Sequence, residues 1–545
     1  MKLIKERIFA NWKSGLTVAL ISVPLSVSLA VASGASPSMG IITAVWAGLF
    51  ASIFGGSNFN IVGPAGALTG LLMAFSISHG MEMMPMLAIF SGIFILISYI
   101  LKLERYLVLV PATVMHGFSL GVAFMIGLGQ LNFAFGLKDL PKHSEFISGV
   151  LATFSHISEI HLPTFSIFLF FLIALFVLVR LLPKVPAIIA VTPLGIMLGY
   201  LIKTRGLFSG VDTLQDRFSD VSINLFSLPS FSFDLSLLTP ALGVAFIAIL
   251  ETLISAKIAD NMTNTKFKAR KEMLGLSLAN IGSGLFGGLP ATGVFVRTSL
   301  NVKAGATHKI SATINAIAVA FICIFFFNYF AYLPMAVIAS ILVFASIRMI
   351  EIKSFVILWH KARKDFWLAI FTAFVMIAVD TVVGLLIGSI LALLFFVEKL
   401  SKGQFEMTTN SEDKKIMHRY YEEESECFKE KCEVLVYSMK GEFAYMNIEA
   451  HTERLEGHSD MFKTIILRMR ELAFIDLEGV YAFDHIVQNL QKNGIKVYVS
   501  SVTQPVENEL KKGETFNQLI EKGKVFKNTR EILKFLDFKD EDVWK

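Results

Sequence analysis

Two charged residues, Glu251 and Arg297, stand inside long apolar stretches of this sequence. In such surroundings a carboxylate can bind a proton, pair with a cation or hold a metal ion, and Ser255 shares the helix face of Glu251 at the i+4 position. A charge at membrane depth is costly unless it faces a cavity or a counter-charge, so both residues are predicted to lie at a functional site. The structural alternative is a static salt bridge between Glu251 and Arg297. The two hypotheses are compatible if the pair forms in one state and breaks in another.

Two apolar segments are interrupted by glycine and proline. FGGSNFNIVGPAGALTGLLMAF (54–75) contains a Gly-Pro break, and GLFGGLPATGVFVRTSLNVKAG (284–305) has a similar Gly/Pro-rich first half. Their helical halves are predicted to begin near Ala65 and Val294. Non-helical backbone survives at membrane depth only where it is buried in protein or lines a polar cavity, and a helix N-terminus carries roughly half a positive charge. Two facing N-termini therefore predict an anion site built from backbone, unless the breaks serve only close helix packing.

The elements that would hold these groups are membrane-spanning helices. Residues 1–400 hold 27 Lys+Arg and 17 Asp+Glu, whereas residues 401–545 hold 22 and 27, so the first part is too apolar for a soluble protein. A helix crosses the bilayer with about 20 apolar residues. Full or broken candidate spans begin near residues 15, 39, 60, 84, 111, 164, 186, 239, 273, 289, 310, 333, 366 and 383, which makes fourteen.

The order of the spans carries information about symmetry and orientation. The two interrupted segments, near 60–78 and 289–303, are the third and the tenth, so each is the third member of a set of seven. Matched interruptions of this kind are typical of inverted repeats. Lys and Arg gather in the junctions that an even count places in the cytoplasm, which predicts that both termini are cytoplasmic.

Several classes of function are not expected. The chain has no Walker A motif, nucleophile elbow or zinc motif, so neither an enzyme nor a cofactor is predicted. No basic arm with interleaved aromatic residues suggests a nucleic acid. The three cysteines, Cys323, Cys427 and Cys432, have no partners at metal spacing and are predicted to be free thiols. The basic N-terminus lacks a cleavage site and is predicted to be a retained cytoplasmic tail.

The charged C-terminal part has a different pattern. CEVLVYSMKGEFAYMN, FKTIILRMRELAFID and IKVYVSSV predict strands, and LEGVYAFDHIVQNLQKNG predicts a helix between the second and third of them. Alternating strands and helices indicate a small α/β layer. We therefore predict three parts, with a transmembrane domain at 1–400, a linker at 401–430 and a cytoplasmic α/β domain at 431–545.

Several motifs together resemble the sulfate permease (SulP) family of anion transporters. They are VPLSVSLAVASGASPSMGI, FGGSNFNIVGPAGALTG, HGFSLGVAFMIGLGQL, LETLISAKIADNMT and GLPATGVFVRTSLNVKAGATH. The resemblance covers essentially the whole chain. It implies fourteen segments in a 7+7 inverted repeat with a core and a gate domain, an elevator-like movement of the core, and a homodimer. The C-terminal part is similar to the STAS domain of that family. Its loop Asp476-Leu477-Glu478-Gly479 has no hydroxyl, so phosphorylation there by the route of related domains is not expected.

The resemblance also assigns residues to roles. It implies an anion site formed by both broken segments and one face of the first span, with Pro64, Ala65, Gly66, Ala67, Thr292, Gly293, Val294, Arg297 and Leu25. It implies a coupling-ion position for H⁺ or Na⁺ at Glu251, with Ser255 beside it. Sodium-coupled bicarbonate members have Asp at the Glu251 position, which favours a proton here. Leu25 matches the bicarbonate-type members rather than the Gln of many sulfate-type members, so the substrate stays open.

The predicted function is secondary active transport of a small inorganic oxyanion of the sulfate or bicarbonate class across the inner membrane. The alternatives are an uncoupled anion exchanger or channel, or a dicarboxylate–proton symporter, of the same fold. A membrane-anchored signalling scaffold is disfavoured because an anchor needs no buried backbone breaks. Expected partners are the anion, membrane lipid and a second copy of the chain, with a cytosolic regulatory protein at the STAS domain.

Overall fold

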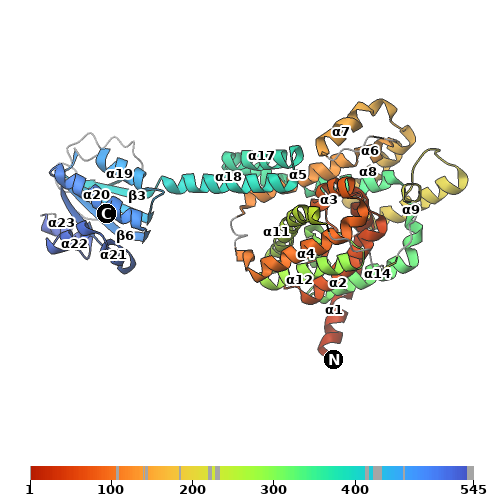
Figure 1. Cartoon of the computed structure of the whole chain (residues 1–545), viewed down its shortest axis with the longest axis horizontal. Helices are drawn as coiled ribbons and strands as arrows, with labels where there is room; N and C mark the ends of the chain where they lie inside the picture. Colours follow the sequence, from red (N-terminus) through yellow and green to blue (C-terminus); the bar gives the residue numbers. More distant parts are fainter. Residues whose placement is uncertain are drawn as a thin grey trace. The chain divides into compact units, whose positions relative to one another are not determined.

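The computed structural model describes residues 2–105, 110–138, 140, 145–182, 186–218, 224–226, 234–410, 417–420, 433–457 and 461–536. Its contacts divide the chain into two units, Met1–Ala392 and Leu393–Lys545, both drawn in Figure 1. Most of the predicted linker at 401–430, together with Cys427 and Cys432, lies outside the described residues. Cys323 is a buried free thiol.

The first unit is built from apolar helices, because inside a bilayer a single apolar segment can satisfy its backbone polar groups internally only as a helix. The helices through the first half are α1 (Lys2–Ala32), α2 (Pro37–Phe54), α3 (Gly66–His79), η1 (Met81–Met83), α4 (Met84–Ile100), α5 (Ala112–Gly129), α6 (Leu131–Phe135), α7 (Phe146–Ser155), η3 (Ile157–Glu159), α8 (Leu162–Leu181), α9 (Ala187–Arg205) and α10 (Leu214–Arg217). Those that follow are η4 (Leu235–Leu237), α11 (Leu238–Thr263), α12 (Ala269–Leu285), α13 (Phe295–Lys303), α14 (Ile310–Phe330), α15 (Met335–Met349), α16 (Ile352–Lys361), α17 (Arg363–Ala378) and α18 (Thr381–Ser401).

These helices confirm the predicted polytopic helical membrane fold. Ten helices among the described residues are long and apolar enough to cross a membrane by length and composition. A helix of the structure corresponds to each of the predicted segments, although the first one, α1, already begins at Lys2. The number of membrane crossings stays a prediction.

The helices pack in matched pairs. α12 packs against α4 as α2 packs against α14, α11 against α4 as α1 against α14, and α15 against α8 as α5 against α17. In each of these comparisons, the second contact is obtained from the first by replacing every helix with the helix at the same position in the other half of the unit. Two structurally equivalent halves produce such matched contacts. Helices α1, α2, α4 and α11–α14 pack mainly on one another, and α5, α8, α9, α15 and α17 form a second group. The resemblance predicts such a division as core and gate.

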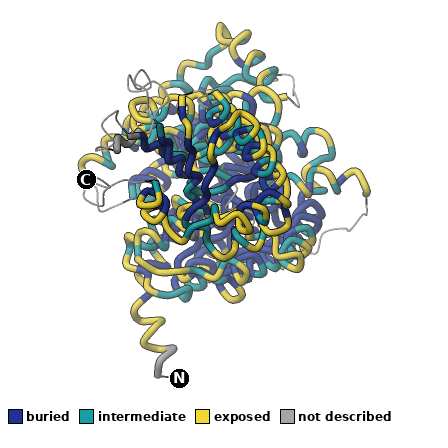
Figure 2. Tube along the Cα trace, turned by 90° about the vertical axis from the view of Figure 1, so that its left-hand side faces the viewer, coloured by how far each residue is buried: buried dark blue, intermediate teal, exposed yellow. Residues whose placement is uncertain are grey.

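Two short strands lie within the helical unit, β1 (Val62–Gly63) and β2 (Thr292–Gly293). They come from the two broken segments and pair antiparallel. Both strands are buried. The N-terminal turns of α1, by contrast, are exposed (Figure 2). The non-helical halves of the broken segments therefore satisfy part of their backbone hydrogen bonds on each other.

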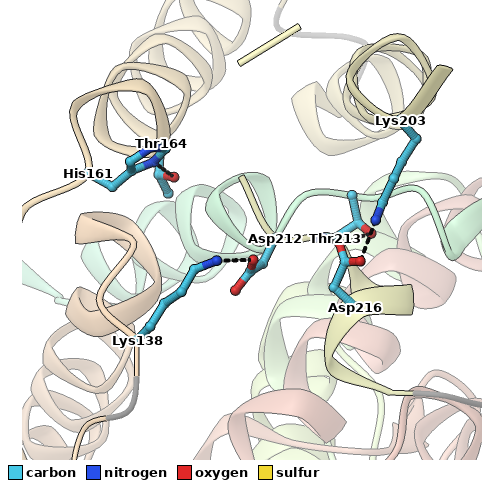
Figure 3. A network of polar contacts seen from close by, with 7 residues as sticks. All are labelled: Lys138, His161, Thr164, Lys203, Asp212, Thr213 and Asp216. Carbon is cyan, nitrogen blue, oxygen red and sulfur yellow. Dashed lines mark hydrogen bonds and ion pairs between the residues drawn. The ribbon is translucent and has the colours of Figure 1, made fainter. Parts of the chain in front are cut away.

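A polar network fixes the segment that follows α9 (Figure 3). Lys138 Nζ donates to Asp212 Oδ1 at 2.8 Å, and Lys203 of α9 pairs with Asp216. Thr213 caps the single turn of α10, with its backbone N–H and its hydroxyl both donating to Asp216 Oδ2 at 2.9 Å. These contacts tie the segment to the end of α9 and to the residues after α6.

The second unit is an α/β domain, as predicted. Its strands are β3 (Gln404–Asn410), β4 (Met417–Tyr420), β5 (Val434–Phe443), β6 (Thr464–Ile475), β7 (Lys496–Ser500) and β8 (Val525–Phe526). Its helices are α19 (Ile448–Gly457), α20 (Leu477–Lys492), α21 (Gln504–Leu510), α22 (Glu514–Glu521) and α23 (Thr529–Phe535). The sheet order is β4-β3-β5-β6-β7-β8, parallel from β5 to β8 and antiparallel at β3 and β4. Strand β5 carries alternate side chains into two buried clusters, Leu435 and Tyr437 into one and Val434 and Val436 into the other.

Candidate functional site

The two broken segments meet at the β1–β2 pair. Val62 lies opposite Gly293 and Gly63 opposite Thr292, and the backbone N–H of Val294 donates to the carbonyl of Ile61 at 2.8 Å. A helix starts directly beyond each strand, so the pairing also brings the two helix starts together. The structure therefore places the interrupted halves side by side, as the facing-N-termini hypothesis requires.

Both helices begin without a side-chain cap. The N-cap residues are Ala65 for α3 and Val294 for α13, neither of which makes a side-chain capping hydrogen bond. These are the residues near which the sequence predicts the helical halves to begin. Uncapped first turns leave backbone N–H groups available, and the helix dipole adds positive potential there. An anion can be bound by such N–H groups.

Arg297 lies in the first turn of α13 with only 1 % of its surface exposed. Among the described residues, its Nε and Nη2 atoms have no hydrogen-bond partner. A Cβ on Gly63 would lie 3.0 Å from its Nη1 atom, so the guanidinium is packed closely against β1. A buried guanidinium with unused donors is unfavourable unless a ligand satisfies it in another state.

Glu251 is buried in the middle of α11, where its Oε2 atom has no hydrogen-bond partner among the described residues. It lies near Thr292 of β2 and interacts electrostatically with Arg297. No ion pair joins Glu251 to Arg297 within the described part of the chain. The static salt bridge is therefore not formed in this structure.

Ser255 is not a partner of Glu251 here. Its hydroxyl lies 2.7 Å from Asn60 Oδ1 and 2.9 Å from Thr298 Oγ1. Thr298 in turn donates to Asn60 Oδ1 and accepts from the backbone N–H of Ile61. In this structure the Ser255 hydroxyl therefore bonds to Asn60 of the first broken segment and to Thr298 of the second. Its sharing of an ion or proton with Glu251 stays a prediction.

Polar residues that sequence reasoning missed hold β2 on α11. The hydroxyl of Thr252 accepts from the backbone N–H of Gly293 at 2.8 Å and lies 3.1 Å from the hydroxyl of Thr292. A Cβ on Gly293 would lie 2.9 Å from the backbone of Thr252 and 2.7 Å from Asn60 Nδ2, so only glycine fits there. Polar residues on the Glu251 turn of an otherwise apolar helix are the signal that could have identified Thr252.

The remaining predicted residues lie around the start of α3. Pro64, Ala65 and Ala67 are buried. A Cβ on Gly66 would lie 2.4 Å from the Ile126 side chain of α5 and 3.9 Å from that of Leu29 on α1. Leu25 is buried one turn before Leu29 on the same face of α1. Helices α1 and α5 therefore flank the N-terminus of α3.

A cavity of about 500 Å³ lies between α1, α9 and α14, away from Arg297. Its lining is almost entirely apolar, and includes Pro24, Pro193 and Phe330. An anion needs donors or positive charge to replace its hydration shell, whereas this lining has no charged residue and its side-chain donors are only the hydroxyls of one threonine and three tyrosines. The candidate anion site is therefore the Arg297 region and not this cavity.

Comparison with known proteins decides the family. Residues 9–372 match the model of the family described as the Sulfate permease family, and residues 428–532 match the STAS domain. The chain belongs to the sulfate permease family. Sulfate permeases are transporters, so membership agrees with the prediction that this multi-pass membrane protein is not an enzyme.

Named relatives of this sulfate permease extend over nearly its whole length. It is 27% identical to the "Putative sulfate transporter YvdB" of Bacillus subtilis, covering 91% of this chain and 92% of that one. It is 24% identical to the bicarbonate transporter BicA of Picosynechococcus, covering 93% and 90%. The structure of the murine Solute Carrier 26 family member A9 anion transporter in the inward-facing state matches with a TM-score of 0.81 at 14% identity, covering 98% and 92%. This last likeness shows the fold.

Proposed function

We propose that this sulfate permease is a secondary active transporter of a small inorganic oxyanion of the sulfate or bicarbonate class. The observation that supports it most is the Arg297 guanidinium, buried with unused donors beside two uncapped helix N-termini. A guanidinium and backbone N–H groups together bind an oxyanion well, because they supply several donors and positive charge at once. The predicted site residues Pro64–Ala67 and Thr292–Val294 surround this point.

Glu251 supports coupling of transport to a second ion, with H⁺ favoured and Na⁺ as the alternative. It is a buried carboxyl with an unpartnered oxygen in the same cluster as Arg297. A pure channel or uncoupled exchanger needs no titratable group there, so Glu251 separates these alternatives. Names of relatives that include sulfate and bicarbonate transporters favour inorganic anions over the dicarboxylate alternative.

Two groups of helices suggest how access alternates. The broken segments belong to the group of α1, α2, α4 and α11–α14, and an elevator-like displacement of this group against α5, α8, α9, α15 and α17 would carry the site across the membrane. We also propose a homodimer in the inner membrane, with both termini cytoplasmic and a regulatory protein at the STAS domain.

Uptake by the purified protein in liposomes tests the proposal. Labelled sulfate, labelled bicarbonate and a labelled dicarboxylate are offered separately, each with an inward H⁺ gradient, an inward Na⁺ gradient or no gradient. We expect accumulation of one anion above its equilibrium level with one of the two gradients. Equal uptake in all three conditions would establish the uncoupled exchanger or channel. Uptake of a dicarboxylate but of neither inorganic anion would establish the dicarboxylate–proton symporter.

A further inference from the structure

Helix α12 carries a stripe of three buried polar residues, Glu272, Asn280 and Ser283. At 100° per residue, Asn280 lies about 80° and Ser283 about 20° around the helix from Glu272, so the three share one face. A polar stripe inside the membrane is costly unless each member is hydrogen-bonded. In this structure every member bonds to one of the two broken segments or to their immediate neighbours.

Glu272 holds the first broken segment. Its Oε2 atom accepts from the backbone N–H groups of Gly56 and Ser57, both at 2.7 Å, and its Oε1 atom accepts from Asn60 Nδ2 at 2.7 Å. Three donors converge on one buried carboxyl, which is the pattern of an ionised, acceptor-only group. The same interaction fixes the orientation of the Asn60 amide, whose Oδ1 is thereby directed to Ser255 and Thr298.

Asn280 and Ser283 hold the second broken segment. Asn280 bonds both backbone groups of Ala291, accepting from its N–H at 2.9 Å and donating to its carbonyl at 2.9 Å. Ser283 donates to the carbonyl of Leu289 at 2.7 Å. Ala291 directly precedes β2, and Asn60 is two residues before β1. Helix α12 therefore binds the two broken segments just before they pair with each other.

We propose that the stripe of α12 is the positioning element of the anion site, with Glu272 as its charged member. That the positioned site binds an anion rests on the proposed function, whereas the positioning of the two broken segments by α12 does not. The stripe holds both broken segments directly before β1 and β2 and so sets the register of the β1–β2 pair. The register in turn sets where α3, with its N-cap Ala65, and α13, which carries Arg297, begin. None of its residues needs to touch the anion.

Hydrogen exchange on the full-length protein tests the positioning without any ligand. The variants are Glu272→Gln, Asn280→Ala and the milder Ser283→Ala. The matched control is Ser277→Ala, which removes a hydrogen bond of the same buried helix but one made to Gly92 of α4. We expect faster exchange in residues 56–63 for Glu272→Gln and in residues 289–297 for the other two, with neither change in the control. If exchange in these segments is the same in the stripe variants and in Ser277→Ala, the proposal is wrong.

Transport by the same variants separates positioning from general instability. With labelled sulfate or bicarbonate, we expect KM to rise about tenfold in Glu272→Gln while kcat falls less, because the geometry of the binding groups is loosened. A proportionate loss of active protein at unchanged KM would contradict a positioning role. Should wild-type protein transport neither anion, the proposed function fails, and the exchange experiment still decides the role of α12. Should Glu272→Gln not fold, Ser283→Ala decides it.

Discussion

Gly63 and Arg297 are in close contact, since a Cβ atom on Gly63 would lie 3.0 Å from Nη1 of Arg297. The first broken segment thus sets the position of the charged group of the second. This relationship joins two positions that are more than two hundred residues apart in the sequence, and it ties the shape of β1 to the anion affinity of the site.

Substitution of Gly63 by alanine is expected to displace the guanidinium and to weaken anion binding. A contact of this length forces the neighbour to move by a few tenths of an ångström, and small misplacements of binding groups lower affinity appreciably. Gly149→Ala is the control, because its added Cβ would meet nothing within 4 Å. The measurement is the KM for labelled anion uptake in liposomes. An unchanged KM would show that the Arg297 position is not critical.

Removal of the guanidinium tests the site more directly. Arg297→Ala is expected to lower anion affinity about 5- to 150-fold, the range for loss of a charge-assisted contact. Lys303→Ala serves as the control, because Lys303 is an exposed cation at the far end of the same helix. Binding is measured by isothermal titration with sulfate and with bicarbonate. Equal affinities of Arg297→Ala and wild type would remove Arg297 from the site.

Neutralisation of Glu251 is expected to uncouple transport. Glu251→Gln keeps the size of the side chain but cannot gain or lose the proton, so gradient-driven accumulation should be lost while exchange of labelled for unlabelled anion continues. The exposed carboxylate of Glu82 provides the control variant Glu82→Gln. Full accumulation by Glu251→Gln would assign the coupling to another group.

The stability of the second unit is expected to depend on pH through His451. Burial, aided by the nearby Arg454, lowers the pKa of this histidine from 6.5 to about 4. Its Nδ1 atom lies 2.7 Å from the Tyr437 hydroxyl, and its Nε2 atom has no partner among the described residues. As the pH falls from 6.5 towards 4, this histidine binds a proton in the unfolded chain but stays neutral in the folded domain. The free energy of unfolding therefore decreases. The pKa difference corresponds to about 3 kcal/mol.

Hydrogen exchange of the β5 amides in the full-length protein measures this loss. After correction for the intrinsic pH dependence of exchange, protection in wild type should fall between pH 6.5 and pH 4. It should fall less in His451→Phe, which cannot titrate. Parallel pH profiles for the two proteins would show that His451 does not limit the stability of the domain.

The class of fold and the positions of the breaks in the helices follow from the amino-acid sequence alone. Apolar length predicts helices in a membrane, because the bilayer leaves the backbone no other partner. Glycine and proline predict the breaks, and the helices after them begin with Ala65 and Val294 as N-caps. The strand and helix pattern predicts a small α/β domain, because periodicity is a local property of the chain. The fourteen-span count and the roles of the site residues remain predictions.

The hydrogen-bond partners of the buried polar groups become known only from the three-dimensional arrangement of the helices. Ser255 follows Glu251 by one helical turn, yet its hydroxyl bonds to Asn60 and Thr298. In the sequence Glu272 is one more charged residue near a helix end, but in the structure its carboxyl accepts hydrogen bonds from the backbone N–H groups of Gly56 and Ser57. This is so because a hydrogen bond depends on distances, to within a few tenths of an ångström, between segments far apart in the sequence, and the periodicity within one helix holds no information about those distances.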